Sequence, residues 1–168
     1  GSATIPQAPQ PLTYTQKADN KNRIMIDISM GAMNMSKQVI SDNVAYMSQQ
    51  GQKMDVPAEG LAEAKDAAMF FPELSSSAGK VTAIESIEGS DAYAIENGKV
   101  TKYYDVKSGL KVAESTTQEQ GGQKMVIMTY FKDYKDVKGV KFPYTLMMNV
   151  GIEIDFKMTD VKVNEGVT

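Results

Sequence analysis

Three groups of acidic residues are the candidates for catalysis or metal binding: Asp19-Asn20-Lys21-Asn22, the segment 133–136, and Glu153 with Asp155. The first two lack the alternating ligands and the distal bidentate glutamate of a calcium loop, so we interpret them as solvated turns. Glu153 and Asp155 share one face of a predicted strand and could pair as glycosidase carboxylates do. Because apolar residues alternate with them, that face should be the solvated one. We therefore predict no catalytic residue and no metal site, and keep a carboxylate hydrolase as the enzymatic alternative.

Histidine and cysteine are both absent from the 168 residues. Histidine is the usual general base near neutral pH and the commonest zinc ligand, and cysteine supplies thiolate nucleophiles and metal ligands. Catalysis by a carboxylate or a lysine stays open. We expect no cofactor, because the sequence contains no phosphate-binding loop, dinucleotide fingerprint or Gly-x-Ser-x-Gly elbow.

The charge of the chain argues against nucleic acid as a partner. Its 18 basic and 21 acidic residues give a net charge of -3, without a basic stripe to neutralise phosphates. Apolar runs such as 125–128 and 146–148 are far shorter than the roughly 20 residues of a membrane-spanning helix. The sequence thus predicts no nucleic-acid binding and no transmembrane segment. The single arginine, Arg23, is expected to form a salt bridge at a strand edge.

The first eleven residues predict a lead-in to the fold. Gly1-Ser2 resembles a scar left by tag removal, and Pro6, Pro9 and Pro11 favour an extended segment. No charged and then apolar leader follows, so we expect that any native signal peptide or preceding domain has been cut away. We interpret residues 1–11 as tag scar and linker, and residues 12–168 as a single β domain.

From position 12 onward, short segments of alternating apolar and polar residues are separated by glycine-containing pairs, which is typical of consecutive antiparallel strands. Asn97-Gly98 is the strongest hairpin signal, and Glu88-Gly89-Ser90-Asp91, Gly121-Gly122 and Lys138-Gly139 add three more. Apolar residues occupy the even positions from Ile24 to Met30. Beyond Gly31 the alternation continues, but the apolar residues Met33 and Met35 occupy odd positions. This shift predicts a bulge near Gly31-Ala32.

The segment between Asp55 and Phe71 is the one predicted helix. Asp55 can cap it, Pro57 suits its first turn, and Pro72 ends it. Small and apolar residues recur there at helical spacing: Ala58, Leu61, Ala64, Ala68 and Phe71. Its polar residues lie on the other side, so we expect the helix to cover the sheet.

These elements amount to about eight to ten strands and one helix. A sheet of that length must curl or close to protect its edges. The predicted fold class is mainly β within the α+β type: a curved antiparallel meander sheet or half-barrel covered by one helix.

Methionine is frequent, with 12 residues in the chain, and most lie in the predicted strands. Because methionine is flexible and polarizable, a face lined with it can adapt to irregular apolar ligands such as acyl chains. The alternative is gap-filling in an ordinary core. The predicted ligand-binding residues are Ile26, Ile28, Met30, Met33, Met35, Met125, Ile127, Met147, Ile154 and Phe156.

Two parts of the sequence resemble bacterial proteins of the LolA/LolB-like type, which sort lipoproteins to the outer membrane. Glu88–Ile95, followed by Lys102–Val112, resembles the pattern "G-x-D-A-Y" and "YYD" with "tGL". Tyr134–Tyr144 is similar to the strand-turn-strand pattern "Y-x-x-v-x-G-v-x-F-P". In addition, the predicted helix together with Phe70–Leu74 resembles domains found behind insulinase-like (pitrilysin-type) zinc peptidases in some Gram-negative bacteria.

The resemblance implies an incomplete barrel with a helix-covered cavity, periplasmic or facing the outer membrane, where relatives of the sorting type hold lipoprotein acyl chains. The peptidase likeness implies a zinc peptidase as the parent protein. The inverted His-x-x-Glu-His zinc motif has no counterpart in a sequence without histidine, so protease activity is not carried over to this domain.

Taken with the residues, these likenesses predict a noncatalytic accessory or binding domain of an exported, zinc peptidase-related protein. The alternative is a periplasmic carrier that binds lipids or lipoprotein acyl chains in the concave face of the half-barrel. The expected partners are a hydrophobic ligand, either an acyl chain or a peptide, and an upstream peptidase domain of the same chain. The expected location is the periplasm or the cell envelope.

Overall fold

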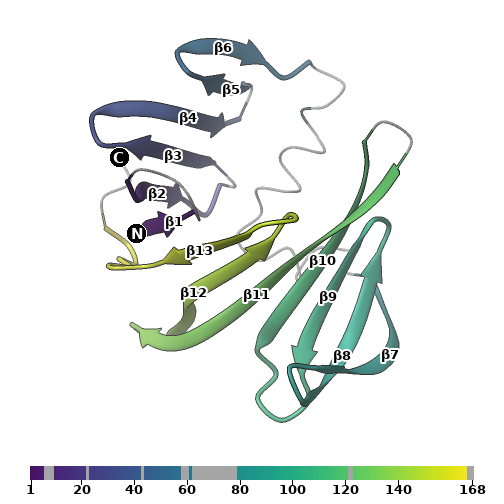
Figure 1. Ribbon diagram of the computed structural model, residues 1–168. Coiled ribbons are helices and arrows are strands. Elements are labelled where there is room, and N and C mark those ends of the chain that lie inside the picture. The colour runs from purple at the N-terminus through teal and green to yellow at the C-terminus, as the bar shows by residue number, and fades with distance from the viewer. Residues whose placement is uncertain are drawn as a thin grey trace. The chain divides into compact units, whose positions relative to one another are not determined.

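The chain forms two compact units in the computed structural model, which describes residues 1–5, 10–21, 23–42, 44–57, 61, 79–120 and 123–165 (Figure 1). Unit 1 comprises residues 1–75 and 162–168, and unit 2 comprises residues 76–161. Within the described residues there are thirteen strands, and Leu61 is in helical conformation. The prediction of a mainly antiparallel β-protein is confirmed.

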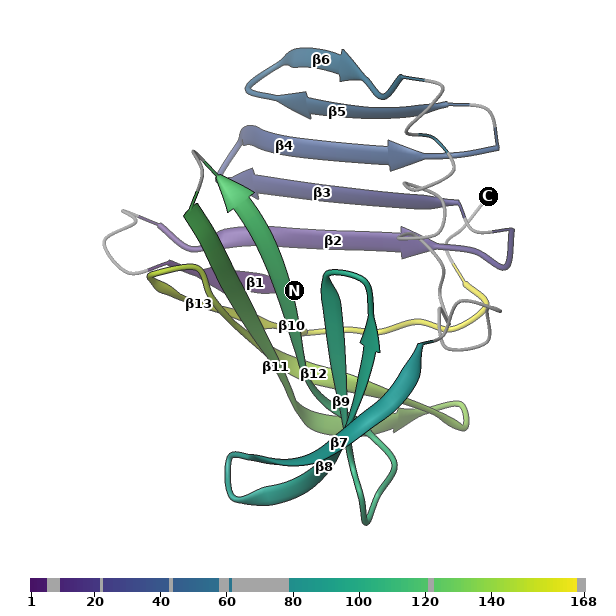
Figure 2. The same ribbon diagram turned by 90° about the vertical axis from the view of Figure 1, so that its right-hand side faces the viewer.

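Unit 1 is an antiparallel sheet in which each strand pairs with its neighbour in the chain, in the order β6-β5-β4-β3-β2-β1 (Figure 2). The strands are β1 (Ser2–Thr4), β2 (Leu12–Ala18), β3 (Ile24–Met30), β4 (Met33–Ile40), β5 (Ala45–Gln49) and β6 (Gln52–Asp55).

Unit 2 is also an antiparallel sheet, with its strands in the order β13-β12-β11-β10-β9-β8-β7. Its strands are β7 (Lys80–Ile87), β8 (Ser90–Asn97), β9 (Val100–Asp105), β10 (Lys111–Gln120), β11 (Gln123–Val137), β12 (Val140–Asn149) and β13 (Glu153–Lys157). As in unit 1, strands that follow one another in the sequence lie next to one another.

Two-residue turns explain how the strands pair so locally. Glu88 and Gly89 have φ values of 49° and 85°, and Lys138 and Gly139 have values of 55° and 84°. Positive φ at both central residues is the geometry of a type I′ turn, whose twist matches that of the flanking strands. These two predicted hairpins and the one at Asn97-Gly98 are confirmed, whereas Gly121-Gly122 lies outside the described residues.

The predicted bulge exists but lies elsewhere. Ile28 pairs with Ser36 and Ser29 pairs with Asn34, so the extra residue is Met35 on β4. The predicted position, Gly31-Ala32, is instead the turn between β3 and β4, where Gly31 has a φ of 58°. The sequence showed the change of parity, but an alternating pattern does not reveal which of two paired strands carries the extra residue.

The sheet begins before the position that the sequence predicts. Ser2 pairs with Thr13 and Ala3 with Leu12, so β1 lies within the segment interpreted as tag scar and linker. Ala3 is fully buried, and the Gly1 ammonium donates a hydrogen bond of 2.8 Å to the Tyr14 carbonyl oxygen. A strand of three residues is too short to show alternation, which is why the pattern missed it.

The predicted helix is not among the elements of the described structure, although Leu61 is in helical conformation. Residues 58–60 and 62–78 lie outside the described residues, so most of the predicted helix lies there too. Leu61 is described, and it packs against the buried pair Ile40 and Ala45. No helix in the described ranges is long and apolar enough to cross a membrane.

The segment 133–136 is not a turn, because it lies inside β11, the longest strand at 15 residues. Asp133 has a positive φ of 54°, and the strand bends along its length (Figure 1). The Asp133 carboxylate accepts a 2.5 Å hydrogen bond from the Thr145 hydroxyl on β12. Asp136 accepts one of 2.9 Å from the Gly139 amide and so supports the turn that follows the strand. A strand with polar residues on both faces resembles a turn in sequence.

The buried core of the described residues is small and made mostly of alanine. In unit 2, Ala92, Ala94 and Ala113 have no exposed surface and surround Tyr103, which is 9% exposed. Ile87, Val112, Met128 and Tyr130 pack around this cluster. Within the described part of the chain, no large side chain is fully buried.

Candidate functional site

One face of the unit 1 sheet is mainly apolar, although Gln16, Ser36 and Gln38 also lie on it. Register places Leu12 opposite Met30, Tyr14 opposite Ile28, and Met33 opposite Met30. Because successive side chains of a strand point to opposite faces, residues that lie directly opposite one another share a face. We call this set the unit 1 apolar face: Leu12, Tyr14, Ile24, Ile26, Ile28, Met30, Met33, Ile40, Met47 and Met54.

The opposite face of the same sheet is mainly polar, although Met25, Val39 and Tyr46 also lie on it. It carries Thr13 and Thr15 from β2, Asp27 and Ser29 from β3, and Lys37 from β4. The Ser29 hydroxyl donates a 2.9 Å hydrogen bond to the Asp27 carboxylate, and the Asn34 amide donates one of 3.0 Å to the same carboxylate. The two faces of unit 1 therefore differ in chemistry, as in an antiparallel sheet with one apolar and one solvated side.

The unit 1 apolar face is covered unevenly. Near its Ile40 end, Ile40 and Ala45 are 4% and 3% exposed, with Ile24, Val56 and Leu61 packed around them. At the β3–β4 turn, by contrast, Met33 is 60% exposed, and toward the β6 edge Met47 and Met54 are 40% and 52% exposed. Flexible methionines thus lie where the face is open.

A second apolar set lies on unit 2. Phe131 lies opposite Leu146, which lies opposite Phe156, and Met148 lies opposite Ile154. Alternation along β11 adds further residues to the same face. We call this set the unit 2 apolar stripe: Met125, Ile127, Phe131, Leu146, Met148, Ile154 and Phe156.

The ten predicted ligand-binding residues therefore divide into two groups, one on each unit. In unit 1, Ile26, Ile28, Met30 and Met33 share the apolar face, while Met35 is the bulged residue. In unit 2, the predicted residues lie on the apolar stripe with one exception. Met147 lies on the other face, opposite Tyr130 and Asp155.

Glu153 and Asp155 do share a face, as predicted, but they differ in surroundings. Glu153 is exposed, whereas Asp155 is half-buried opposite Met147. Its Oδ1 atom is buried without a hydrogen-bond partner. In the described part of the chain, no group of three acidic, histidine or cysteine residues is placed to hold a metal ion.

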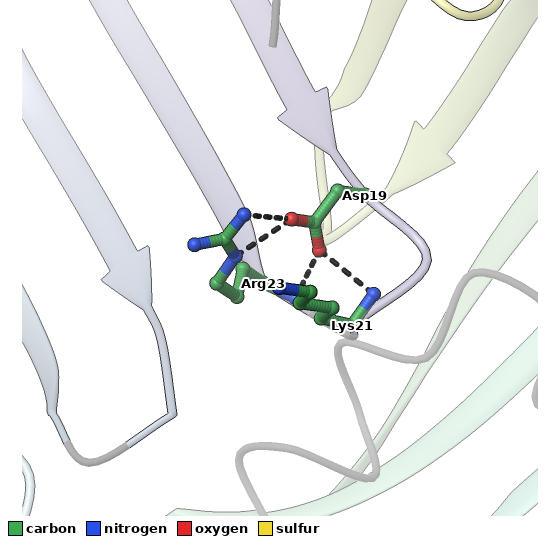
Figure 3. A network of polar contacts seen from close by, with 3 residues as sticks. All are labelled: Asp19, Lys21 and Arg23. Carbon is green, nitrogen blue, oxygen red and sulfur yellow. Dashed lines mark hydrogen bonds and ion pairs between the residues drawn. The ribbon is translucent and has the colours of Figure 1, made fainter. Parts of the chain in front are cut away.

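The turn between β2 and β3 is held by a network centred on Asp19 (Figure 3). Its Oδ1 atom accepts hydrogen bonds from the backbone amides of Lys21 and Arg23, at 3.0 and 3.1 Å. Its Oδ2 atom accepts one of 2.6 Å from Arg23 Nε and forms an ion pair of 2.5 Å with Nη2. The predicted salt bridge of Arg23 is confirmed, and the described residues 19–21 of the predicted turn lie between β2 and β3. The network closes a hairpin and leaves the arginine engaged within the turn.

The Asp19 network makes the turn sensitive to acid. Hydrogen bonds from the Arg23 side chain, followed by those from backbone amides, lower the pKa of Asp19 below its ordinary value of 3.8. A lowered carboxyl pKa means that the contribution to stability is present above the ordinary value and is lost as the pH falls through the folded-state value. We expect the Arg23 Nε proton resonance to keep its position down to a pH below 3.8 and then to shift. An NMR titration measures this, and an Asp19→Ala variant should show the shifted position at every pH.

Residues of the sequence motifs in unit 2 have structural roles. Asp105 accepts hydrogen bonds of 2.7 and 2.6 Å from the amide and hydroxyl of Ser108, which closes the turn after β9. The Ser108 side chain is the largest cause of the lowered pKa of Asp105. The Tyr134 hydroxyl donates a 2.6 Å hydrogen bond to the Lys111 carbonyl oxygen and so joins β11 to the start of β10.

Two of the pockets among the described residues have linings that are more polar than apolar. One, of about 390 Å³, is lined by Gln49, Gln50, Gln52 and Met54. The other, of about 370 Å³, is lined by Glu96, Gly98, Lys99, Thr101, Thr117 and Lys124. None of the ten predicted ligand-binding residues lines either pocket, so the place of a ligand on these residues stays a prediction.

Sequence reasoning missed several members of both apolar sets. Leu12 and Tyr14 alternate on β2, but Gln16 interrupts the pattern after them. Burial raises the pKa of Tyr14 above its ordinary value. In unit 2, Phe131, Leu146 and Met148 also alternate, but their shared face became visible only with the register of β11 and β12. Register, not residue type, was the missing information.

No family model and no curated protein matches the sequence. Solved structures do match. A LolA superfamily protein from Nitrosomonas europaea superposes with a TM-score of 0.64 at 11% identity, covering 99% of this chain and 84% of that chain. A DUF1329 family protein from Desulfovibrio piger superposes with a TM-score of 0.60 at 10% identity, with the same coverage of 99% and 84%. The LolA-like fold that the first of the two sequence resemblances implies is therefore confirmed, and the likeness to peptidase-associated domains stays a prediction.

Proposed function

We propose that this protein is a noncatalytic carrier that holds a hydrophobic chain, such as the acyl chain of a lipid or lipoprotein, against the unit 1 apolar face. The observation that carries the proposal is the incomplete cover of this face. Ile40 and Ala45 are buried at one end, whereas Met33, Met47 and Met54 remain 60%, 40% and 52% exposed. Met47 and Met54 lie directly opposite one another, and exposed apolar side chains that gather in this way mark ligand or partner sites more often than scattered ones do.

The chemistry of the face favours an acyl chain. Its exposed members are methionines, which adapt to irregular apolar shapes. Its members Ile26 and Ile28 are β-branched, so their side chains have few rotamers and form a more rigid part of the surface. The charged residues Asp27 and Lys37 lie on the opposite face of the sheet. A ligand without charge along its length fits such a surface, and the LolA-like fold supports the proposal.

Native mass spectrometry of delipidated protein tests the proposal directly. A palmitoylated peptide should give a bound species, and the same peptide without its acyl chain should give none. Each methylene removed from water contributes about 0.8 kcal/mol, so shortening the chain by two carbons should weaken binding by roughly tenfold. Equal binding of the acylated and unacylated peptides would contradict the proposal.

Substitutions on the two faces of unit 1 locate the binding site. Ile28→Asp places a carboxylate on the apolar face, and we expect it to weaken binding of the palmitoylated peptide by at least about tenfold, because an acyl chain would desolvate that charge. Met33→Asp should weaken it as well with little effect on folding, since Met33 is 60% exposed. Thr13→Asp, exposed on the opposite face, is the matched control and should leave binding unchanged. If all three variants bind like the parent chain, the ligand does not lie on this face.

The role as an accessory domain beside a peptidase domain, and the periplasmic or envelope location, stay predictions. A full-length gene product with a leader peptide and an upstream peptidase domain would support the accessory role. A leader peptide followed directly by this domain would favour the free-standing carrier.

A further inference from the structure

The outer edge of β7 is an open strand edge. β7 is the last strand in the sheet order of unit 2 and pairs only with β8 among the described strands. Residues 80–86 are all exposed, and Val81 and Ile84 are 62% and 61% exposed. An edge of this kind presents unpaired amide and carbonyl groups that can pair with another strand.

The sequence of β7 is complementary to itself in one antiparallel register. When two copies are paired so that Lys80 lies opposite Glu85, Val81 lies opposite Ile84 and Thr82 opposite Ala83. Each of these pairs then occurs twice. Opposite charges and apolar β-branched residues are the cross-strand pairs that stabilise antiparallel sheets. Neither Lys80 nor Glu85 takes part in an ion pair within the described residues, so both charges are available to a partner.

Because β7 has a bulge, this register places the charged pairs on one face of the extended sheet and the apolar pairs on the other. Lys80 and Glu85 are five residues apart, and in a regular strand they would point to opposite faces. Pairing with β8 shifts between Val81 and Ala83, so Lys80 and Glu85 lie on the face of Glu96 and Ala92. Val81 and Ile84 lie together on the other face, opposite Ile95 and Tyr93. Two copies therefore extend the sheet with charged pairs on one side and apolar pairs on the other.

The other edge strand of the described sheets, β6, lacks these properties. It has only four residues, Gln52–Asp55, and its charges are already paired with each other. Lys53 and Asp55 form an ion pair of 2.7 Å, and the Lys53 ammonium lies 4.7 Å from the centre of the Tyr46 ring. Short, charged edges of this kind resist pairing with other strands.

From these observations we propose that two copies of the chain associate through antiparallel pairing of their β7 strands, with Lys80 of each copy opposite Glu85 of the other. The contact is isologous and uses the same patch on both copies, so it closes on itself as a dimer and does not propagate. The interface is small, which predicts a dimer that dissociates on dilution.

Charge reversal in single and double variants tests the pairing. Sedimentation equilibrium at low ionic strength, over roughly 10 μM to 1 mM, should show concentration-dependent dimers of the parent chain, as expected for a small interface. K80E alone places two glutamates opposite each other, and E85K alone places two lysines opposite each other. Either variant should weaken dimerisation about tenfold, because each like-charge contact occurs twice. The double variant K80E/E85K restores both pairs and should dimerise within about threefold of the parent chain.

The outcomes separate this edge from other surfaces. A monomer at all concentrations, or a double variant as weak as the single ones, would overturn the proposal. Ile84→Lys should also abolish the dimer, whereas Met54→Lys on β6 should leave it intact. A dimer lost with Met54→Lys and kept with Ile84→Lys would assign the contact to the other edge instead.

Discussion

Replacing Tyr103 with alanine is expected to lower the free energy of unfolding by about 3–5 kcal/mol, the range for deleting a large buried aromatic ring. Tyr103 is the largest residue of the unit 2 core, and its neighbours Ala92, Ala94 and Ala113 are too small to fill the space it would leave. Urea denaturation followed by circular dichroism measures the loss as a lower midpoint at an unchanged slope.

Tyr103→Phe separates the ring from the hydroxyl. It keeps the packing against the three alanines, so it should cost less than about 1 kcal/mol. Equal losses for Tyr103→Phe and Tyr103→Ala would show that the hydroxyl, and not the ring, stabilises this cluster.

Enlarging Ala94 to leucine should destabilise the protein by about 1–3 kcal/mol, because extra methylene groups in a packed site force side chains and backbone apart. Ala94 has no exposed surface and lies directly opposite Tyr103 on β9. Thermal or urea unfolding of the variant gives the change in the free energy of unfolding.

The matched control for Ala94 lies on the neighbouring strand. Ala83 is opposite Ala94 but exposed, so Ala83→Leu should change the free energy of unfolding by no more than about 0.5 kcal/mol. A similar loss in both variants would mean that leucine disturbs the strand itself and that packing against Tyr103 is not the cause.

Strand pairing could be predicted from the sequence because the turns are short and chemically distinctive. Pairs such as Glu88-Gly89 and Lys138-Gly139 require positive φ, and they occur between runs of alternating residues. Each turn then determines which strands are neighbours. The prediction failed where the signal was short or mixed, as in the three-residue β1 and in the polar segment 133–136 within β11.

Which of the predicted ligand-binding residues share a face could be predicted only where one alternation runs through a short turn. Ile26, Ile28, Met30 and Met33 do share a face, because they follow one alternation through a turn. Met147 and Met148 are adjacent in sequence, and only the pairing of β12 with β13 decides which of them shares a face with Ile154. A shift of one residue moves a side chain to the other face of a sheet, and composition carries no information about that shift.

The motifs that carried the family resemblance are explained by the structure. Tyr103 fills the core of unit 2, Asp105 closes the turn after β9, and Tyr134 joins β11 to β10. These roles concern packing and turn geometry. The motifs were therefore informative about fold, and they do not identify a ligand.

Within each unit, every strand pairs with the strand before or after it in the chain. Contacts between residues close in sequence cost little loop-closure entropy, so each hairpin can assemble before the rest of its sheet exists. In such a sheet, each new strand can pair with the preceding one as soon as it has been synthesised. Within each unit, the search for distant partners that slows the folding of large β-proteins is therefore largely absent.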